Sequence, residues 1–324
     1  MVDFINKQRP STLAPSQEIF ECRITHVRYV ALGVANLDSS LGFYRDEWGL
    51  AAEHVEGDLA FLAAEGSTDP FALRLRGAGE NRLDLVSFAV PTRADVDWYA
   101  DRLVAAGVRL VTEPGPVDGL GGGYGFRFLD PVEGRTLEIA ADLTPRTARE
   151  IGHREHLPTG ISHMVMNSAR LPELVDFFHR HLGFYKSDYL DDAMVFLKGA
   201  TPVHHQFAVS ANIHANVNHV AYETRDIDEY MRAAGSMLRR GHQMVWGPGR
   251  HGPGDNTFAY FSDPNGFVAE YTTELEPIED ITTWQPRIWR RVPEESDQWG
   301  TACARNPEPF IGKPDTGLWT PPPV

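Results

Sequence analysis

Cysteine is nearly absent from this sequence, which has two thiols, Cys22 and Cys303, near opposite ends of the chain. Two isolated thiols exclude a disulfide framework and a zinc site built from cysteines. Long apolar runs are absent as well: no stretch approaches the ~20 apolar residues that cross a bilayer, and residues 1–18 show no basic-then-apolar signal segment. We therefore expect a cytoplasmic protein in a reducing compartment, without a membrane partner.

Basic residues are in deficit, because 30 Lys and Arg face 45 Asp and Glu, for a formal net charge of −15. This balance argues against nucleic acid or an anionic membrane as a partner, since phosphates would be repelled. The hydrophobic share of 42% and the charged share of 23% are ordinary for a globular protein. A length of 324 residues exceeds one typical domain and predicts about two.

Internal repetition is the strongest pattern in the chain. Three pairs of segments match: 24–50 with 161–184, 84–111 with 218–245, and 124–142 with 258–274. The first pair predicts a strand that opens with His, then an amphipathic helix that ends in aromatics before Gly. The second predicts a strand, a helix that opens at an Asp, and another strand. The third predicts hairpins with Asp-Pro and Gly in the turn and a return strand that ends in Glu.

Each half of the chain is therefore expected to contain two βαβββ modules. The predicted fold class is α+β, with two tandem domains that each form a curved, partly open mixed barrel. The expected parts are an N-terminal extension 1–23, a first domain 24–142, a polar linker 143–159, a second domain 160–274, and a Pro- and Trp-rich arm 275–324. Proline disfavours regular ladders in the arm, so we expect it to lie extended over the body or a neighbour. Its large aromatics favour subunit contacts and a homo-oligomer, a dimer or tetramer.

Two histidines and a glutamate occupy matching strand positions in the second half: His163, His219 and Glu270. Two His and one carboxylate commonly hold a divalent transition metal with an open coordination face. One ligand from each module edge would converge inside a curved sheet. Taken singly, a strand His is more often a hydrogen-bonded core residue, and Glu270 could be an edge-strand charge. The metal prediction depends on all three coinciding at repeat positions.

The first half of the chain serves as an internal control. Its equivalent positions carry His26, Leu85 and Glu138. A leucine side chain has no atom that can ligate a metal. We therefore expect the metal in the second domain alone, with the first domain as a structural copy.

The stretch WGPGRHGPGDNTFAYFSDPNGFVAEY (246–271) resembles the C-terminal signature of the type I extradiol ring-cleaving dioxygenases, members of the vicinal oxygen chelate superfamily. The resemblance covers about 24–274, and GPGRHG is similar to the branch that cleaves homoprotocatechuate; 2,3-dihydroxybiphenyl dioxygenases are also similar. The pair His204-His205 in HHQFAV resembles the catalytic histidine segment of the family. The remaining positions that carry the resemblance are His251, Tyr260, Pro264, Gly266 and Glu270.

The resemblance implies a vicinal oxygen chelate fold and extradiol (meta) cleavage of a catechol-type ring, with both atoms of O2 inserted. It implies Fe(II), less often Mn(II), held by His163, His219 and Glu270, with O2 as cosubstrate. His205, the more probable of the two adjacent histidines to point inward, would polarise oxygen and later act as an acid. His251 and Tyr260 would hydrogen-bond to the substrate oxygens. A near-neutral imidazole can pass a proton each way, which is compatible with these roles.

One departure from the family concerns the substrate. Where the homoprotocatechuate branch tends to carry an arginine before the GRH segment, this chain has Trp246. The missing cation favours an apolar or aromatic ring substituent over a carboxylated one. Arg287, Arg290 or Arg291 could replace it if the arm folds over the pocket.

Two other functions stay open. The chain could be a lyase, isomerase or epimerase of the same fold that uses Mg, Mn, Ni or Zn as a Lewis acid and does not need His205, His251 and Tyr260. It could also be a binding protein for an aromatic ligand, although proteins of that kind are generally half as long and lack the three ligands.

Overall fold

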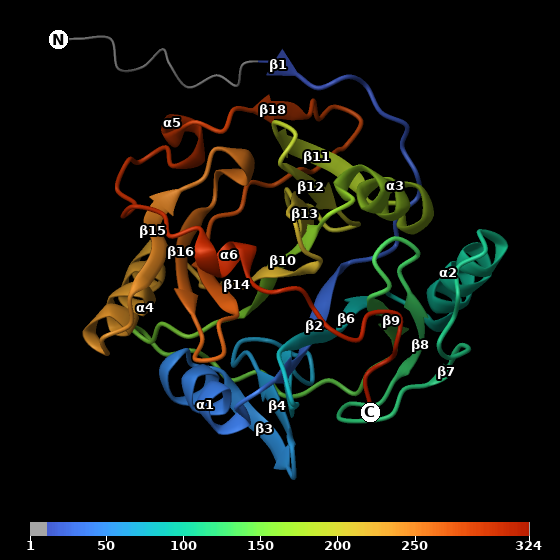
Figure 1. The fold of residues 1–324 in the computed structure, drawn as a ribbon, viewed down its shortest axis with the longest axis horizontal. Coiled ribbons are helices and arrows are strands. Elements are labelled where there is room, and N and C mark those ends of the chain that lie inside the picture. Colours follow the sequence, from blue (N-terminus) through green and yellow to red (C-terminus); the bar gives the residue numbers. More distant parts are fainter. Residues whose placement is uncertain (1–11, 324) are drawn as a thin grey trace.

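The computed structural model describes residues 12–323 and contains two β-sheets built from four βαβββ modules (Figure 1). The first module comprises β2 (His26–Val34), α1 (Leu37–Gly42), the π-helical turn η1 (Phe43–Glu47), β3 (Ala51–Glu56), β4 (Leu59–Ala63) and β5 (Leu73–Gly77). The second comprises β6 (Arg82–Ala89), α2 (Arg93–Ala105), β7 (Gly115–Pro116), β8 (Tyr124–Leu129) and β9 (Thr136–Ala141). Together they form a sheet with the order β3-β4-β5-β2-β6-β9-β8-β7.

The second half repeats this plan. Its third module comprises β10 (Gly160–Ser168), α3 (Leu171–Leu182), β11 (Tyr185–Leu190), β12 (Met194–Lys198) and β13 (Phe207–Ala211). The fourth comprises β14 (Asn216–Glu223), α4 (Ile227–Arg239), β15 (Met244–Arg250), the 3-10 turn η2 (Pro253–Asp255), β16 (Thr257–Ser262) and β17 (Val268–Thr272). The sheet order is β1-β18-β11-β12-β13-β10-β14-β17-β16-β15, where β1 (Thr12–Leu13) and β18 (Arg287–Trp289) lie outside the modules, and the sheet stays open. The α+β fold with two tandem domains is confirmed.

The registers of the two sheets are equivalent around the two glutamates. In the second sheet Glu270 of β17 pairs with Ala221 of β14, and in the first sheet Glu138 of β9 pairs with Ser87 of β6. Because the ladders are equivalent, Glu138 stands where Glu270 stands in the other domain. The prediction that Glu270 ends its strand is wrong, since β17 continues for two more residues.

Helix starts follow local capping chemistry. The Asp226 side chain accepts a hydrogen bond from the backbone N–H of Glu229 and begins α4, as the sequence predicts. In α2 the cap is Thr92 instead, and Asp95 lies three residues inside the helix, where its carboxylate accepts from the Thr92 N–H. The expectation that both helices open at an Asp therefore holds for one of them.

The two domains share a continuous apolar core. The Phe88 ring of the first sheet lies 5.6 Å from the Phe207 ring of the second, centroid to centroid. Trp48 stacks on Tyr271 at 3.7 Å, and the Tyr271 hydroxyl donates to the Trp48 carbonyl. These contacts fix β17, the strand that carries Glu270, against the first domain.

The C-terminal arm crosses both domains. It forms β18 (Arg287–Trp289), α5 (Pro293–Ser296) and α6 (Glu308–Ile311), and Figure 1 shows the second sheet curving around α6. Contrary to the expectation that the arm forms no ladder, β18 pairs with β11 and with β1 (Thr12–Leu13), because its three residues lie between proline positions. The Trp319 N–H donates to the Gly134 carbonyl of the first domain.

The proposed domain boundaries stay a prediction, and residues 1–11 of the extension and Val324 of the arm lie outside the described residues. Segment 143–159 contains no helix or strand. Among residues 12–323, no helix is long and apolar enough to cross a membrane.

Candidate metal centre

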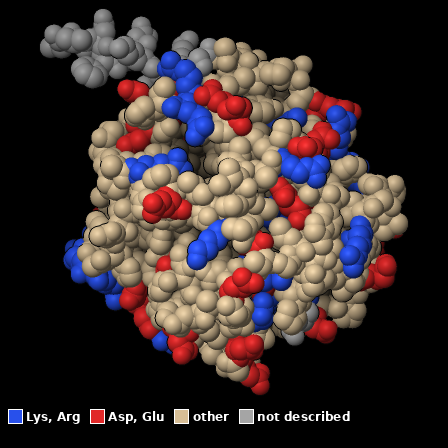
Figure 2. Space-filling view, viewed as in Figure 1, with Lys and Arg blue, Asp and Glu red and all other residues tan. Residues whose placement is uncertain are grey.

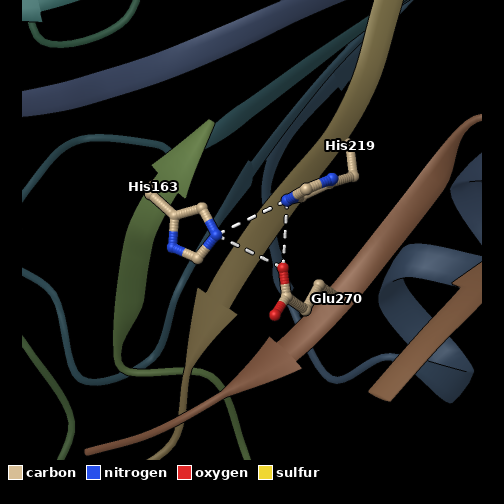
Figure 3. Close-up of side chains that lie close together, drawn as sticks. All are labelled: His163, His219 and Glu270. Carbon is tan, nitrogen blue, oxygen red and sulfur yellow. Dashed lines mark hydrogen bonds and ion pairs between the residues drawn. The ribbon is translucent and has the colours of Figure 1, made fainter. Parts of the chain in front are cut away.

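His163, His219 and Glu270 converge from three adjacent strands, β10, β14 and β17 (Figure 3). The Glu270 Oε2 atom lies 3.1 Å from His219 Nε2 and 3.3 Å from His163 Nε2, and the two Nε2 atoms are 3.4 Å apart. All three side chains are buried. Three donor atoms of the type that transition metals prefer thus face one point inside the second sheet.

The protonation of these residues suits a cation. Both Glu270 oxygens are fully buried and lack a hydrogen-bond partner among the described residues, although a buried carboxylate ordinarily needs one. Burial alone would raise the pKa of Glu270, but the charge of His163 lowers it to about 2. His219 Nδ1 donates to the Asn218 side-chain oxygen, which leaves a lone pair on Nε2 toward Glu270. Burial also lowers the pKa of His219 and keeps its ring neutral.

In the first domain an arginine side chain fills the space beside Glu138, the counterpart of Glu270. Arg28 donates to Glu138 and to the Ser87 hydroxyl, and Arg127 donates to the other Glu138 oxygen, each Glu138 contact at 2.8 Å. Leu85, the counterpart of His219, is fully buried. The expectation that His26 matches His163 is wrong: His163 pairs with Ala221, and the residue that pairs with the equivalent Ser87 is Tyr29. His26 lies three residues earlier and contacts Asp69, 3.1 Å away. A guanidinium charge therefore compensates Glu138, and residues 12–323 contain no second cluster of His, Cys, Asp or Glu side chains that could hold a metal.

His205 lies beside the three ligands, with its ring centroid 4.5 Å from that of His163. It lines the central cavity, whereas His204 behind it does not. Burial is the largest of the effects that lower the pKa of His205 well below its usual value, followed by the charges of neighbouring histidines. His205 is thus held as a neutral imidazole that can accept a proton.

His251 and Tyr260 form a second pair on the cavity wall. The His251 Nδ1–H donates to the Ser296 carbonyl at 3.0 Å, which makes Nε2 the acceptor of the Tyr260 hydroxyl at 2.9 Å. Burial lowers the pKa of His251 to about 4 and raises that of Tyr260 well above its usual value. Both groups are therefore neutral: the Tyr260 hydroxyl can donate to an oxyanion, and His251 Nε2 can accept from a hydroxyl.

The cavity enclosed by these groups has a volume of about 80 Å³. The described side chains that line it include aromatic ones from both the second sheet and the arm, Phe196, Trp246 and Phe310. A wider hollow of about 440 Å³ shares Leu190, Met194 and other lining residues with it. Figure 2 shows that this face of the molecule is hollowed, with acidic and basic side chains scattered around it rather than gathered in one patch.

Arg305 is the arm cation that reaches the cavity, and the sequence reasoning missed it. Its guanidinium lies 4.6 Å from the Phe310 ring centroid and 5.2 Å from that of Trp246, and no acidic partner pairs with it among residues 12–323. Of the three expected arginines, Arg290 pairs with Glu295 and Arg287 lies over Trp284. Arg291 lines only the outer hollow. Arg305 stands in an irregular, Pro-containing stretch that carries no periodic signal.

The comparisons with known proteins cover most of the chain. The family model described as Glyoxalase/Bleomycin resistance protein/Dioxygenase superfamily matches residues 23–139 and 160–271. A manganese-dependent 2,3-dihydroxybiphenyl 1,2-dioxygenase of Geobacillus genomosp. 3 is 28% identical over 286 residues, which cover 81% of this chain and 89% of the relative.

Solved structures are similar as well. The crystal structure of a Mn(II)-bound glyoxalase from Novosphingobium aromaticivorans is 38% identical and superimposes with a TM-score of 0.86, covering 92% of this chain and 98% of that one. A homoprotocatechuate 2,3-dioxygenase from Brevibacterium fuscum, in an anaerobic complex with 3,4-dihydroxyphenylacetate, is 23% identical with a TM-score of 0.79, covering 92% and 95%. At this lower identity the likeness concerns the fold.

Proposed function

This chain belongs to the Glyoxalase/Bleomycin resistance protein/Dioxygenase superfamily, and from that premise we propose that it is an extradiol dioxygenase, which opens a catechol ring with O2. One observation carries the proposal: the two histidines of a 2-His-1-carboxylate group line the same cavity as His205, His251 and Tyr260. A Lewis-acid lyase needs the first group but not all of the second. The names of the curated relatives, which include metapyrocatechases, support the same reaction.

His163, His219 and Glu270 are proposed to hold Fe(II) or Mn(II), since two neutral nitrogens and one anionic oxygen suit either ion. When bound, the ion would supply a Lewis-acidic centre at which both catechol oxygens and O2 can meet.

The protein side chains then handle protons and charge. His205, neutral and buried, is placed to take a proton from a catechol hydroxyl and to return one later. Tyr260 can swing its hydroxyl hydrogen from His251 Nε2 to a developing oxyanion, which frees the Nε2 lone pair to accept a hydrogen bond from another hydroxyl. Buried aromatic side chains around these groups exclude water, which strengthens each of these hydrogen bonds.

The ring substituent is proposed to lie between Trp246 and Phe310 and to end near Arg305. Two aromatic side chains favour an apolar or aromatic substituent, as the sequence suggests. Arg305, which lines the cavity and has no acidic partner among the described residues, adds a preference for an acidic group on that substituent. We also propose that the chain forms a homo-oligomer, a dimer or tetramer, which light scattering on purified protein would test.

The test is oxygen uptake by protein loaded anaerobically with Fe(II) or Mn(II). A panel of catechols with neutral and carboxylated substituents is added, and absorbance is followed for the yellow ring-opened product. We expect stoichiometric O2 consumption and colour with at least one catechol, and a loss of about 10²-fold or more in H205A. An absence of O2 uptake across the panel with metal-replete protein would overturn the proposal.

The second candidate is a metal-dependent lyase or isomerase. It is favoured by the name of the 38% identical structure, a Mn(II)-bound glyoxalase. Such an enzyme would act without consuming O2, and H205A would leave its rate unchanged. The oxygen electrode therefore separates the two candidates.

A further inference from the structure

Behind His205 lies a chain of buried polar groups that has no part in holding a metal. His204 Nδ1 is 2.9 Å from His205 Nδ1, and His204 Nε2 is 3.2 Å from Asp188 Oδ2. All three side chains are at most 2% exposed. Asp188 is an acidic residue buried inside β11, and burial of a carboxylate requires a partner.

Asp188 is itself held by the C-terminal arm. The backbone N–H of Arg287 donates to Asp188 Oδ1 at 2.7 Å, and the Trp289 indole N–H donates to Oδ2 at 2.6 Å. Because both oxygens accept N–H groups, the site is arranged for a carboxylate rather than a carboxylic acid. The pairing of β11 with β12 is irregular between Lys186 and Asp188, and such a bulge re-aims a side chain.

This arrangement fixes the tautomers of both histidines. His204 Nε2 is buried and forms no hydrogen bond within the described part of the chain, and the Asp188 carboxylate faces it at 3.2 Å. A lone pair there would face the Asp188 carboxylate, so the proton belongs on His204 Nε2 and the lone pair on its Nδ1. His205 must then donate from its own Nδ1, which leaves a lone pair on Nε2, a nitrogen with no hydrogen bond to residues 12–323.

We propose that Asp188 and His204 are positioning residues that hold His205 in the tautomer whose Nε2 can accept a proton, and that β18 of the arm anchors this relay. The proposal rests on the proposed function. A catechol hydroxyl that yields its proton to Nε2 keeps the O–H bonding electrons as an oxyanion. The charge gained by His205 is then stabilised through His204 by Asp188, as an anion stabilises an imidazolium in other triads.

The direct test reads the tautomers by long-range ¹H–¹⁵N NMR of histidine-labelled protein whose metal site is filled with diamagnetic Zn(II). Wild type is expected to show His205 protonated on Nδ1 and His204 on Nε2. In D188N the amide N–H₂ can face His204 and shift its proton, so the His205 signals change to the other tautomer or a mixture. An unchanged His205 tautomer in D188N, or a wild type protonated on His205 Nε2, overturns the proposal.

The kinetic test compares oxygen uptake by Fe(II)-loaded variants at equal metal content. In D188N we expect kcat to fall about 10- to 100-fold, part of what a positioned acid–base group contributes, with KM changed less than about twofold. W289F removes one hydrogen-bond donor to Asp188 but keeps the Arg287 N–H, so its kcat should fall about threefold to tenfold. If D188N does not fold, W289F tests the role of Asp188 in its place. S187A is the matched control, because the buried Ser187 hydroxyl forms no hydrogen bond among the described residues, and it should match wild type.

The two levels of failure are distinguishable. If D188N loses metal, or if kcat and KM deteriorate together, Asp188 is merely structural and the relay is refuted. If wild type shows no oxygen uptake with any catechol, the proposed function fails, yet the tautomer measurement still decides the relay.

Discussion

Replacing Arg28 by methionine would uncover what the guanidinium does in the first domain. Arg28 and Glu138 are 2% and 1% exposed at the side chain, and their contact of 2.8 Å is reinforced by the Ser87 hydroxyl. Methionine fills a similar volume without charge, so Glu138 is left buried with Arg127 as its remaining cation. Breaking a buried pair by removing one partner costs about 3–5 kcal/mol. Because Arg127 stays, we expect R28M to lose about 3 kcal/mol of unfolding free energy.

Urea unfolding followed by tryptophan fluorescence measures this loss in metal-free and Mn(II)-loaded protein. The same decrease is expected in both, with bound metal and oxygen uptake per folded molecule unchanged, because Arg28 lies in the domain without the metal ligands. R45M is the matched control: Arg45 pairs with Asp46 on the exposed surface, and its unfolding midpoint should equal that of wild type. A stable R28M, or one that loses metal, would refute the reasoning.

Three further predictions concern the metal centre and the cavity beside it. E270Q should weaken Mn(II) binding by more than the 10- to 100-fold that a residue supporting a ligand typically contributes. EPR of free Mn(II) measures this affinity, and tight binding by E270Q would count against Glu270 as a ligand. For His251, burial lowers the pKa to about 4, so the unfolded state binds the proton first as pH falls below ~6.5. The free energy of unfolding of metal-free protein should therefore fall by up to about 3 kcal/mol between pH ~6.5 and ~4. In H251Q this decrease should be absent when the free energy of unfolding is measured against pH. R305Q should raise KM for a carboxylated catechol about tenfold or more while leaving a neutral phenyl-catechol within about twofold, and equal effects on both would contradict the assigned role of Arg305.

The repeated sequence predicts the architecture because each module must bury the same faces. Strand alternation and turn residues recur in the paired segments, so the four modules and the position equivalence of Glu138 and Glu270 follow from the chain alone. The meeting of His163, His219 and Glu270 was predictable for the same reason, since the repeat places each on a strand that faces one curved interior. Leu85 in the place of His219 likewise predicts a first domain without three ligands.

Other parts of the site depend on contacts that no periodicity encodes. Asp188 reaches His204 because of an irregularity in β11 and because the arm brings two donors to it. Arg305 reaches the cavity because a segment without regular structure packs over the second sheet, and its neighbours in sequence give no indication of this. The position of Arg28 beside Glu138, where its guanidinium stands in for a metal ion, could not be predicted either. In the sequence Arg28 is a single charge within an apolar strand.

The most direct test of the central claim is the position of the metal. Crystals of protein loaded with Mn(II) are measured near the manganese absorption edge, and an anomalous difference map is calculated. The account predicts a peak within about 2.0–2.4 Å of His163 Nε2, His219 Nε2 and a Glu270 oxygen. A peak beside Leu85 and Glu138, or none between the three ligands in metal-replete crystals, would contradict it.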